Sequence, residues 1–191
     1  MCYNITMKKS IITIGGPPGS GKSTIAKRTA NRLGYDHYSS GDFMRNMAKD
    51  RGLTLEELSK KAETNPEIDK KIDARNKKLA DKTNIVVDSR LAFYFIPDSF
   101  SVYLDVSVDE AAHRIYSDEH EKRATSGEDQ DEIKDLKKDI GERLASEKKR
   151  YQDLYQLDHT NHTHYDLIID TNTKDIATVT QIVLDGYNEN H

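Results

Sequence analysis

Residues 10–24 read SIITIGGPPGSGKST, and this stretch decides the fold. Its first part, residues 10–14, is a β-branched apolar run that predicts a buried strand. After the glycine-rich segment, apolar residues recur every three to four positions between Lys22 and Leu33, which predicts a helix, and Gly34 stands where a helix should stop. The sequence therefore predicts a strand, a tight loop and a helix in immediate succession.

The loop itself, residues 16–23, satisfies the pattern G-x-x-x-x-G-K-[ST]. Glycines let consecutive backbone N–H groups turn inward around phosphate oxygens, and the N-terminus of the next helix adds unpaired donors. Lys22 is placed to reach the β and γ phosphates of a nucleoside triphosphate, and the Ser23 hydroxyl is placed to bind Mg²⁺. The alternative is a glycine turn followed by a surface lysine. The expected triphosphate contacts are Gly16, Pro17, Pro18, Gly19, Ser20, Gly21, Lys22, Ser23 and Thr24.

The rest of the chain alternates between strand and helix patterns. Further strands are predicted at 35–39, 85–87, 101–104 and 167–170, and helices from 40–42 onward and at 53–62, 66–80, 109–154 and 175–187. We expect neither 53–62 nor 66–80 to be deeply buried, and we expect a mobile break at 125–127. This alternation predicts an α/β fold with a parallel sheet covered on both faces, and ligands bound beyond the carboxyl ends of its strands.

Composition limits the class of protein. The 191 residues contain no long Gly/Ser/Pro stretch, so we expect one domain, and 32% charged residues favour a soluble chain. The net charge of -4 offers no general attraction to nucleic acid. No apolar run is long enough to span a bilayer and residues 1–10 lack a secretory pattern, so we expect a cytoplasmic protein without a membrane partner. Cys2 has no internal disulfide partner, and Met7 is an alternative start.

Beyond the loop, four segments carry a resemblance to a known family: residues 39–42 (SSGD) with Arg45 one turn later, residues 88–91 (DSRL), and two charged helical stretches at 53–72 and 142–151. Together with the loop they resemble the cytidylate kinase family, most closely its short, archaeal-type branch. The resemblance implies the P-loop kinase fold, a parallel five-stranded sheet flanked by helices. It also implies a single domain over 1–191, with a monophosphate-binding insertion at about 40–82 and a lid at about 114–150.

The resemblance implies ATP-dependent phosphorylation of CMP, and usually of dCMP, with Mg²⁺ bound alongside ATP. Ser40, Asp42 and Arg45 then bind the acceptor, because a planar guanidinium grips a phosphate through two parallel hydrogen bonds. The alternative is that Ser40 or Asp42 caps a helix while Arg45 is an exposed helical charge.

Arg90 matches the arginine that the family places on the acceptor phosphate, where a fixed cation offsets developing charge. The alternative is a surface arginine. Ser89 stands where the family usually has glycine. Asp88 has two interpretations: it belongs to the Mg²⁺ shell or orients the acceptor, or it is an acidic residue that merely ends a strand.

Arg143, Glu147 and Arg150 occupy positions i, i+4 and i+7, which lie on one face of a helix. By resemblance the two arginines reach phosphate or the acceptor, and Glu147 replaces an acidic residue, often Asp, that contacts the base. The alternative is a salt-bridge ladder on an exposed face. The residues expected to act in catalysis are Lys22, Arg90, Arg143 and Arg150.

Arg114 matches the arginine at the lid entry that contacts ATP in related kinases, and Arg123 is either a second lid contact or a solvated charge. The histidines at 159, 162 and 164 lie in a polar loop without cysteine or a carboxylate triad, so we predict no metal site there.

The leading hypothesis is a monomeric cytidylate kinase whose partners are ATP and a nucleoside monophosphate. One alternative is a kinase for another nucleoside monophosphate or small metabolite on the same fold, because the contacts to the acceptor base are the weakest part of the pattern. A second alternative is a nucleotide-binding switch with little transfer activity, although the chain lacks the Asn-Lys-x-Asp motif of many guanine-binding switches.

Overall fold

The computed structural model describes residues 10–120 and 129–190, and within them five parallel strands form one sheet in the order β2-β3-β1-β4-β5. The strands are β1 (Ile11–Gly15), β2 (Asp36–Ser39), β3 (Ile85–Asp88), β4 (Phe100–Asp105) and β5 (Leu167–Asp170). The predicted parallel five-stranded α/β fold is therefore confirmed. Because β2 and β3 lie on one side of β1 and the chain then crosses to β4 on the other side, the ends of β1, β3 and β4 border a switch point, where such sheets bind ligands.

Helices connect these strands. They are α1 (Lys22–Leu33), α2 (Ser40–Asp50), α3 (Leu55–Thr64), α4 (Glu67–Leu79), α5 (Ala92–Phe95), α6 (Val108–His120), α7 (Gln130–Tyr155), the 3₁₀ turn η1 (His162–His164) and α8 (Ile176–Glu189). The long helical stretch expected at 109–154 is divided into α6 and α7. We did not predict α5 and η1, since elements of four and three residues are too short to show a period. The expected break at 125–127 lies outside the described residues, as do Cys2, Met7 and Arg123.

The core forms on both faces of the sheet, because successive residues of a strand point to opposite sides. Ile12 and Ile14 of β1 pack with α1 and α8, whereas Ile11 packs on the other face with α4 and α5. This double coverage explains why the strands read as continuous apolar runs. Among the described residues, no helix is both long and apolar enough to cross a membrane.

The three helices between β2 and β3 form a layer with an apolar centre of their own. Leu58 of α3 and Ile68 of α4 are fully buried there, together with Met47 and Ala48 of α2. The expectation that 53–62 and 66–80 avoid deep burial is therefore wrong. Most of their charges are exposed, apart from the buried Asp69 and Asp73 of α4, and each helix packs its apolar stripe against the others.

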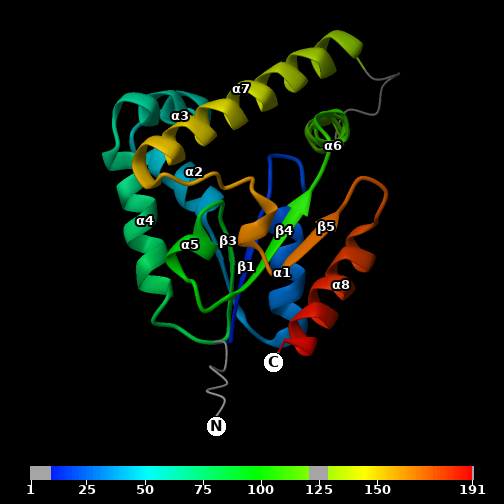
Figure 1. The fold of residues 1–191 in the computed structure, drawn as a ribbon. Coiled ribbons are helices and arrows are strands. Elements are labelled where there is room, and N and C mark those ends of the chain that lie inside the picture. Colours follow the sequence, from blue (N-terminus) through cyan, green and yellow to red (C-terminus); the bar gives the residue numbers. More distant parts are fainter. Residues whose placement is uncertain (1–9, 121–128, 191) are drawn as a thin grey trace.

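Figure 1 shows α7 crossing beyond the carboxyl ends of the strands, on the same side as the loop between β1 and α1. In this view α2 lies below α7 and α3 lies level with its C-terminal half, while α6 comes between β4 and α7 in the chain. The glycine-rich loop thus lies at the end of the sheet that is covered by helices from two separate parts of the chain, α2 and α3 from one and α6 and α7 from the other.

We expect Ile12→Ala to lower the free energy of unfolding by about 2–5 kcal/mol, because it leaves a cavity at the centre of a sheet covered on both faces. Urea unfolding followed by circular dichroism measures the change. Ile168→Ala is the matched control on the outer strand β5, where the side chain is 41% exposed. An equal loss in both variants would contradict this description of the core.

Candidate active site

The loop between β1 and α1 follows a path open only to glycine at two positions. Gly16 has φ +140°, and a Cβ there would lie 2.3 Å from the Leu104 carbonyl oxygen. Gly19 has φ +72°, and a Cβ there would lie 2.7 Å from the Ala111 carbonyl oxygen. Both conformations are strained for any residue with a side chain. The loop can therefore lie against β4 and α6 only because these two positions are glycines.

The N-terminus of α1 has no side-chain cap, since its N-cap residue is Gly21 in the left-handed conformation. Its first backbone N–H groups lack partners within the helix and carry partial positive charge. An anion at this end would satisfy them, which is how helix N-termini bind phosphate.

Lys22 folds back over the loop, and its Nζ donates to the Pro17 carbonyl oxygen at 2.5 Å. Burial, and next the nearby Arg90 cation, lower the pKa of Lys22 from 10.5 to about 7, and Arg143 acts in the same direction. Glu147 and Asp88 oppose this effect without cancelling it. Three cations therefore gather at the loop with too little negative charge nearby, a field that favours an anionic ligand.

Asp88 ends β3 and is 3% exposed, and three side chains converge on it. Ser23 and Ser39 donate to its Oδ1 at 3.2 and 3.0 Å, and His37 Nε2 lies 2.6 Å from its Oδ2. The interpretation of Asp88 as an incidental strand end does not account for this convergence. Sequence reasoning missed His37, although it lies two residues before Ser39 on β2 and so points to the same face of the sheet.

Ser23 and Asp88 bring together the hard oxygen ligands that Mg²⁺ prefers, in contact with each other beside an anion site. Within residues 10–120 and 129–190, no group of three or more His, Cys, Asp or Glu side chains is arranged to hold a metal ion. This donor set fits Mg²⁺, which usually takes one or two protein ligands and completes its octahedron with phosphate oxygens and water.

The residue that caps α2 is neither of the two candidates, Ser40 and Asp42. The N-cap is Ser39, whose hydroxyl accepts from the Asp42 backbone N–H at 3.2 Å, so neither Ser40 nor Asp42 caps the helix. Ser40 is buried and donates to Asn76 at 3.4 Å. Arg45 pairs with Asp42 at 2.5 Å, and its side chain is 54% exposed. These three candidate residues therefore do not share one environment.

The candidate residues of α7 meet Arg90. Glu147 is 5% exposed and forms ion pairs with Arg90 and, at 3.1 Å, with Arg143. Burial would raise the pKa of Glu147, but the two guanidinium groups hold it below its usual value. Arg150 pairs with the buried Asp69 of α4 at 3.1 Å. The alternative of a salt-bridge ladder on an exposed face is confirmed for the i, i+4 pair of Arg143 with Glu147 but wrong about exposure, because α4 and the segment after β3 cover this face.

The partners on α4 were missed by sequence reasoning. Asp69, Asp73 and Asn76 are all buried, and they repeat the i, i+4, i+7 spacing of the candidate residues on α7. Tyr155 at the end of α7 donates to Asp73, and burial raises the pKa of Asp73 to about 6. The shared spacing was a usable signal, since polar residues that recur on one helix face often meet a complementary face.

A cavity of about 950 Å³ opens beside the loop and α1. Residues 171–176, directly after β5, line its far side, and Arg45 and Arg114 also border it. Arg114 of α6 donates to the Thr171 carbonyl oxygen at 2.5 Å and pairs with Glu110 at 2.8 Å. Sequence reasoning missed residues 171–176, although the end of a parallel strand is where ligand contacts are expected.

A second cavity, of about 380 Å³, lies between α3 and α7 on the other side of the loop. Pro18 borders it, as do Ser59 and Glu63 of α3. The same face of α7 that carries Arg143, Glu147 and Arg150 forms its opposite wall. The loop therefore separates two spaces, each bordered by arginine.

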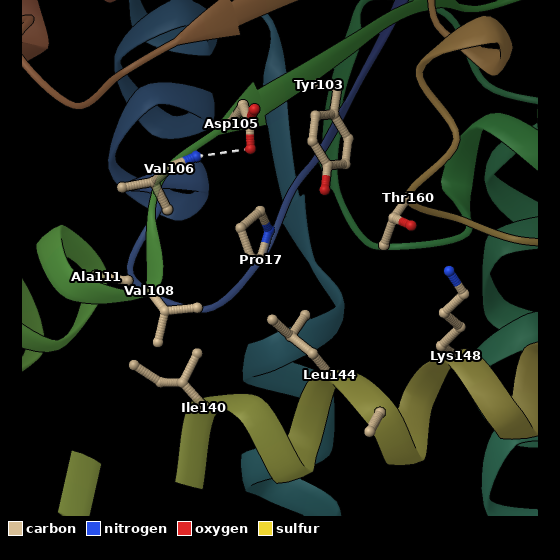
Figure 2. A pocket seen from close by; sticks show the side chains of 11 residues that line it. Pro17, Tyr103, Asp105, Val106, Val108, Ala111, Ile140, Leu144, Lys148 and Thr160 are labelled. Atoms are coloured by element: carbon tan, nitrogen blue, oxygen red, sulfur yellow. Dashed lines mark hydrogen bonds between the residues drawn. The ribbon is translucent and has the colours of Figure 1, made fainter. Parts of the chain in front are cut away.

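A third cavity, of about 230 Å³, lies behind the loop (Figure 2). Pro17 is at its centre, Ile140 and Leu144 of α7 form an apolar wall, and Tyr103 and Thr160 close another side. Apart from Pro17, its lining contains no predicted site residue.

The three histidines of the loop after α7 contact three different aromatic rings. His159 packs edge-on against Tyr151 at 5.0 Å, His162 lies 5.0 Å from Tyr103, and His164 stacks on Phe93 at 5.7 Å. These contacts describe packing of the loop against α7, β4 and α5, and the three rings do not converge on one point.

We expect Gly16→Ala to destabilise the fold and to weaken nucleotide binding, because the added Cβ meets the Leu104 carbonyl oxygen and the positive φ is strained. Urea unfolding and calorimetric titration with ADP measure the two effects. Gly141→Ala is the control: this helical glycine has open space around it, and alanine there should stabilise the protein by about 0.5–1 kcal/mol. Normal ADP affinity in Gly16→Ala would contradict the proposed loop geometry.

Comparison with known proteins accounts for most of the chain. The model of the cytidylate kinase-like family matches residues 11–173. The cytidylate kinase of Methanocaldococcus jannaschii is 41% identical over 91% of this chain and 94% of its own, and that of Halobacterium salinarum is 37% identical over 92% and 88%. A shikimate kinase structure from Bacteroides thetaiotaomicron shares the fold, with a TM-score of 0.61 and 16% identity over 93% of this chain and 98% of that chain. This chain belongs to the cytidylate kinase-like family.

Proposed function

We propose that this chain transfers the γ phosphate of ATP to CMP and also to dCMP, forming the nucleoside diphosphate. The observation that carries the proposal is the gathering of Lys22, Arg90 and Arg143 at the phosphate-binding loop, each from a different part of the chain. Three cations at one point suit a reaction in which two phosphorylated molecules must approach each other despite their charge. The archaeal relatives that match along most of their length are cytidylate kinases, which supports the choice of acceptor.

ATP is assigned to the larger cavity, with its phosphates in the loop over residues 16–24 and its base towards residues 171–176. Arg114 borders this cavity and is fixed by Glu110 and Thr171, so it can contact ATP without first having to be ordered. Ser23 and Asp88 would hold Mg²⁺, whose charge offsets that of the β and γ phosphates.

The acceptor is assigned to the cavity between α3 and α7. In this assignment α2–α4 form the monophosphate-binding insertion, and α6 and α7 belong to the lid. Arg90, Arg143 and Arg150 serve the acceptor phosphate and the transferring group, and Glu147 orders two of these guanidinium groups. Ser40, Asp42 and Arg45 of α2 do not line this cavity, and Arg45 borders the larger one instead; its exposed side chain would turn from there to reach the acceptor phosphate.

Catalysis in this arrangement consists of positioning and charge neutralisation rather than covalent chemistry by the protein. The loop holds the γ phosphate, and the Lys22 ammonium group stays in contact with it as its negative charge is redistributed during transfer. The arginines hold the acceptor oxygen in line with it. The roof formed by α7 keeps water away from the γ phosphate, where water would otherwise compete as acceptor.

We expect Lys22→Ala to lower kcat/KM for phosphate transfer by about 100-fold or more, because it removes a cation whose contact strengthens in the transition state. Lys27→Ala on the same helix is the control, since Lys27 is exposed to solvent and should leave the rate unchanged. A coupled assay of ADP release measures both variants. Unchanged turnover in Lys22→Ala would overturn the mechanism.

The acceptor is tested by comparing ADP release with CMP, dCMP, UMP, AMP and GMP, with each product identified by chromatography. We expect CMP and dCMP to give stoichiometric diphosphate and the highest kcat/KM. Preference for another monophosphate would move the assignment to a different kinase of this fold. ATP hydrolysis that no acceptor stimulates would instead favour a nucleotide-binding switch.

A further inference from the structure

His37 lies on the edge strand β2 and has no role in the site described so far. Its Nε2 is 2.6 Å from Asp88 Oδ2, and its side chain is 20% exposed. An ionised carboxylate can only accept hydrogen bonds, so the imidazole must donate from Nε2. The Nε2 atom of His37 is thus occupied by Asp88.

The sheet itself aligns these groups. In the parallel pairing of β2 with β3, His37 is opposite Val86 and Ser39 is opposite Asp88. His37 and Ser39 are two residues apart on one strand and so point to the same face. Their contacts to Asp88 therefore come from a rigid element rather than from a loop.

The three contacts are distributed over both carboxylate oxygens of Asp88. His37 takes Oδ2, while Ser39 and Ser23 both donate to Oδ1. Hydrogen bonds to both oxygens fix the plane of the carboxylate, which a single contact would leave free to rotate. Oδ1 is thereby held beside the Ser23 hydroxyl at the start of α1.

We propose that His37 is a positioning residue for the metal site: by holding Oδ2 of Asp88, it keeps Oδ1 aimed at the Mg²⁺ that accompanies the bound nucleotide. This inference rests on the proposed function, because it takes Ser23 and Asp88 as the Mg²⁺ site. Residues that orient metal ligands through hydrogen bonds commonly change metal affinity by about 10–100-fold when they are replaced.

The test measures ADP affinity by calorimetric titration with and without Mg²⁺, a reading that involves no turnover. The wild-type protein should bind ADP more tightly with Mg²⁺. In His37→Leu this gain should shrink by about 10-fold, while metal-free ADP affinity stays the same. His37→Gln carries an amide N–H at the same distance from the backbone and should restore most of the gain.

Two further variants separate positioning from support of the strand. Tyr38→Phe removes the hydrogen bond between Tyr38 and Lys82, on the opposite face of β2, and should leave the Mg²⁺ effect intact. His37→Asn carries the same amide on a shorter side chain that does not reach Asp88. If His37→Leu does not fold, the difference between His37→Gln and His37→Asn decides the matter.

Three results would overturn the role of His37 but leave the proposed metal site in place. They are a full gain of ADP affinity from Mg²⁺ in His37→Leu, an equal loss of that gain in His37→Gln and His37→Asn, and a loss of metal-free ADP affinity as large as the loss measured with Mg²⁺. A wild-type protein that gains no ADP affinity from Mg²⁺ would overturn the metal site in the proposed function, and the role of His37 with it. The wild-type titration therefore distinguishes the two failures.

Discussion

At Gly16 the phosphate-binding loop passes so close to β4 that a side chain would meet the Leu104 carbonyl oxygen at 2.3 Å, and the other elements of the site depend on this approach. It brings the loop onto the end of the sheet and directs the N-terminus of α1 at the space above the strands. Backbone N–H groups supply much of that site, so its geometry depends on the main-chain path more than on any side chain. Asp88 and Arg90 are then in place because β3 pairs with β1 and ends beside the loop.

Buried charge organises the remainder of the site. Removing charges from water is costly unless they are paired, and the structure pairs Arg90 and Arg143 with Glu147, and Arg150 with Asp69. Within the described part of the chain, Lys22 has no carboxylate partner among its hydrogen bonds, and burial, followed by the nearby Arg90 cation, lowers its pKa. The cations are thus held in a compact array, and the electrostatic cost of that array would be relieved by bound phosphate.

The two halves of the site differ in how they are built. The cavity proposed for the donor is bordered by α1 and the loop after β5, both attached to the central sheet. The cavity proposed for the acceptor lies between α3 and α7, helices that pack mainly on other helices at one end of the sheet. His37 and Asp88 lie on the sheet between these halves, where a rigid strand pair can hold a carboxylate in one orientation.

Local patterns in the sequence determined the five strands, most of the helices and the loop over 16–23, because each depends on residues close together along the chain. Only the tertiary structure decided which charged side chains of the site pair with each other. Glu147 is 57 residues from Arg90, and Asp69 is 81 from Arg150, so no local period could link them. The same holds for the burial of α3 and α4 and for His37 on Asp88. Periodicity shows which face of an element is apolar, but the identity of the group opposite a charge is decided when distant elements pack.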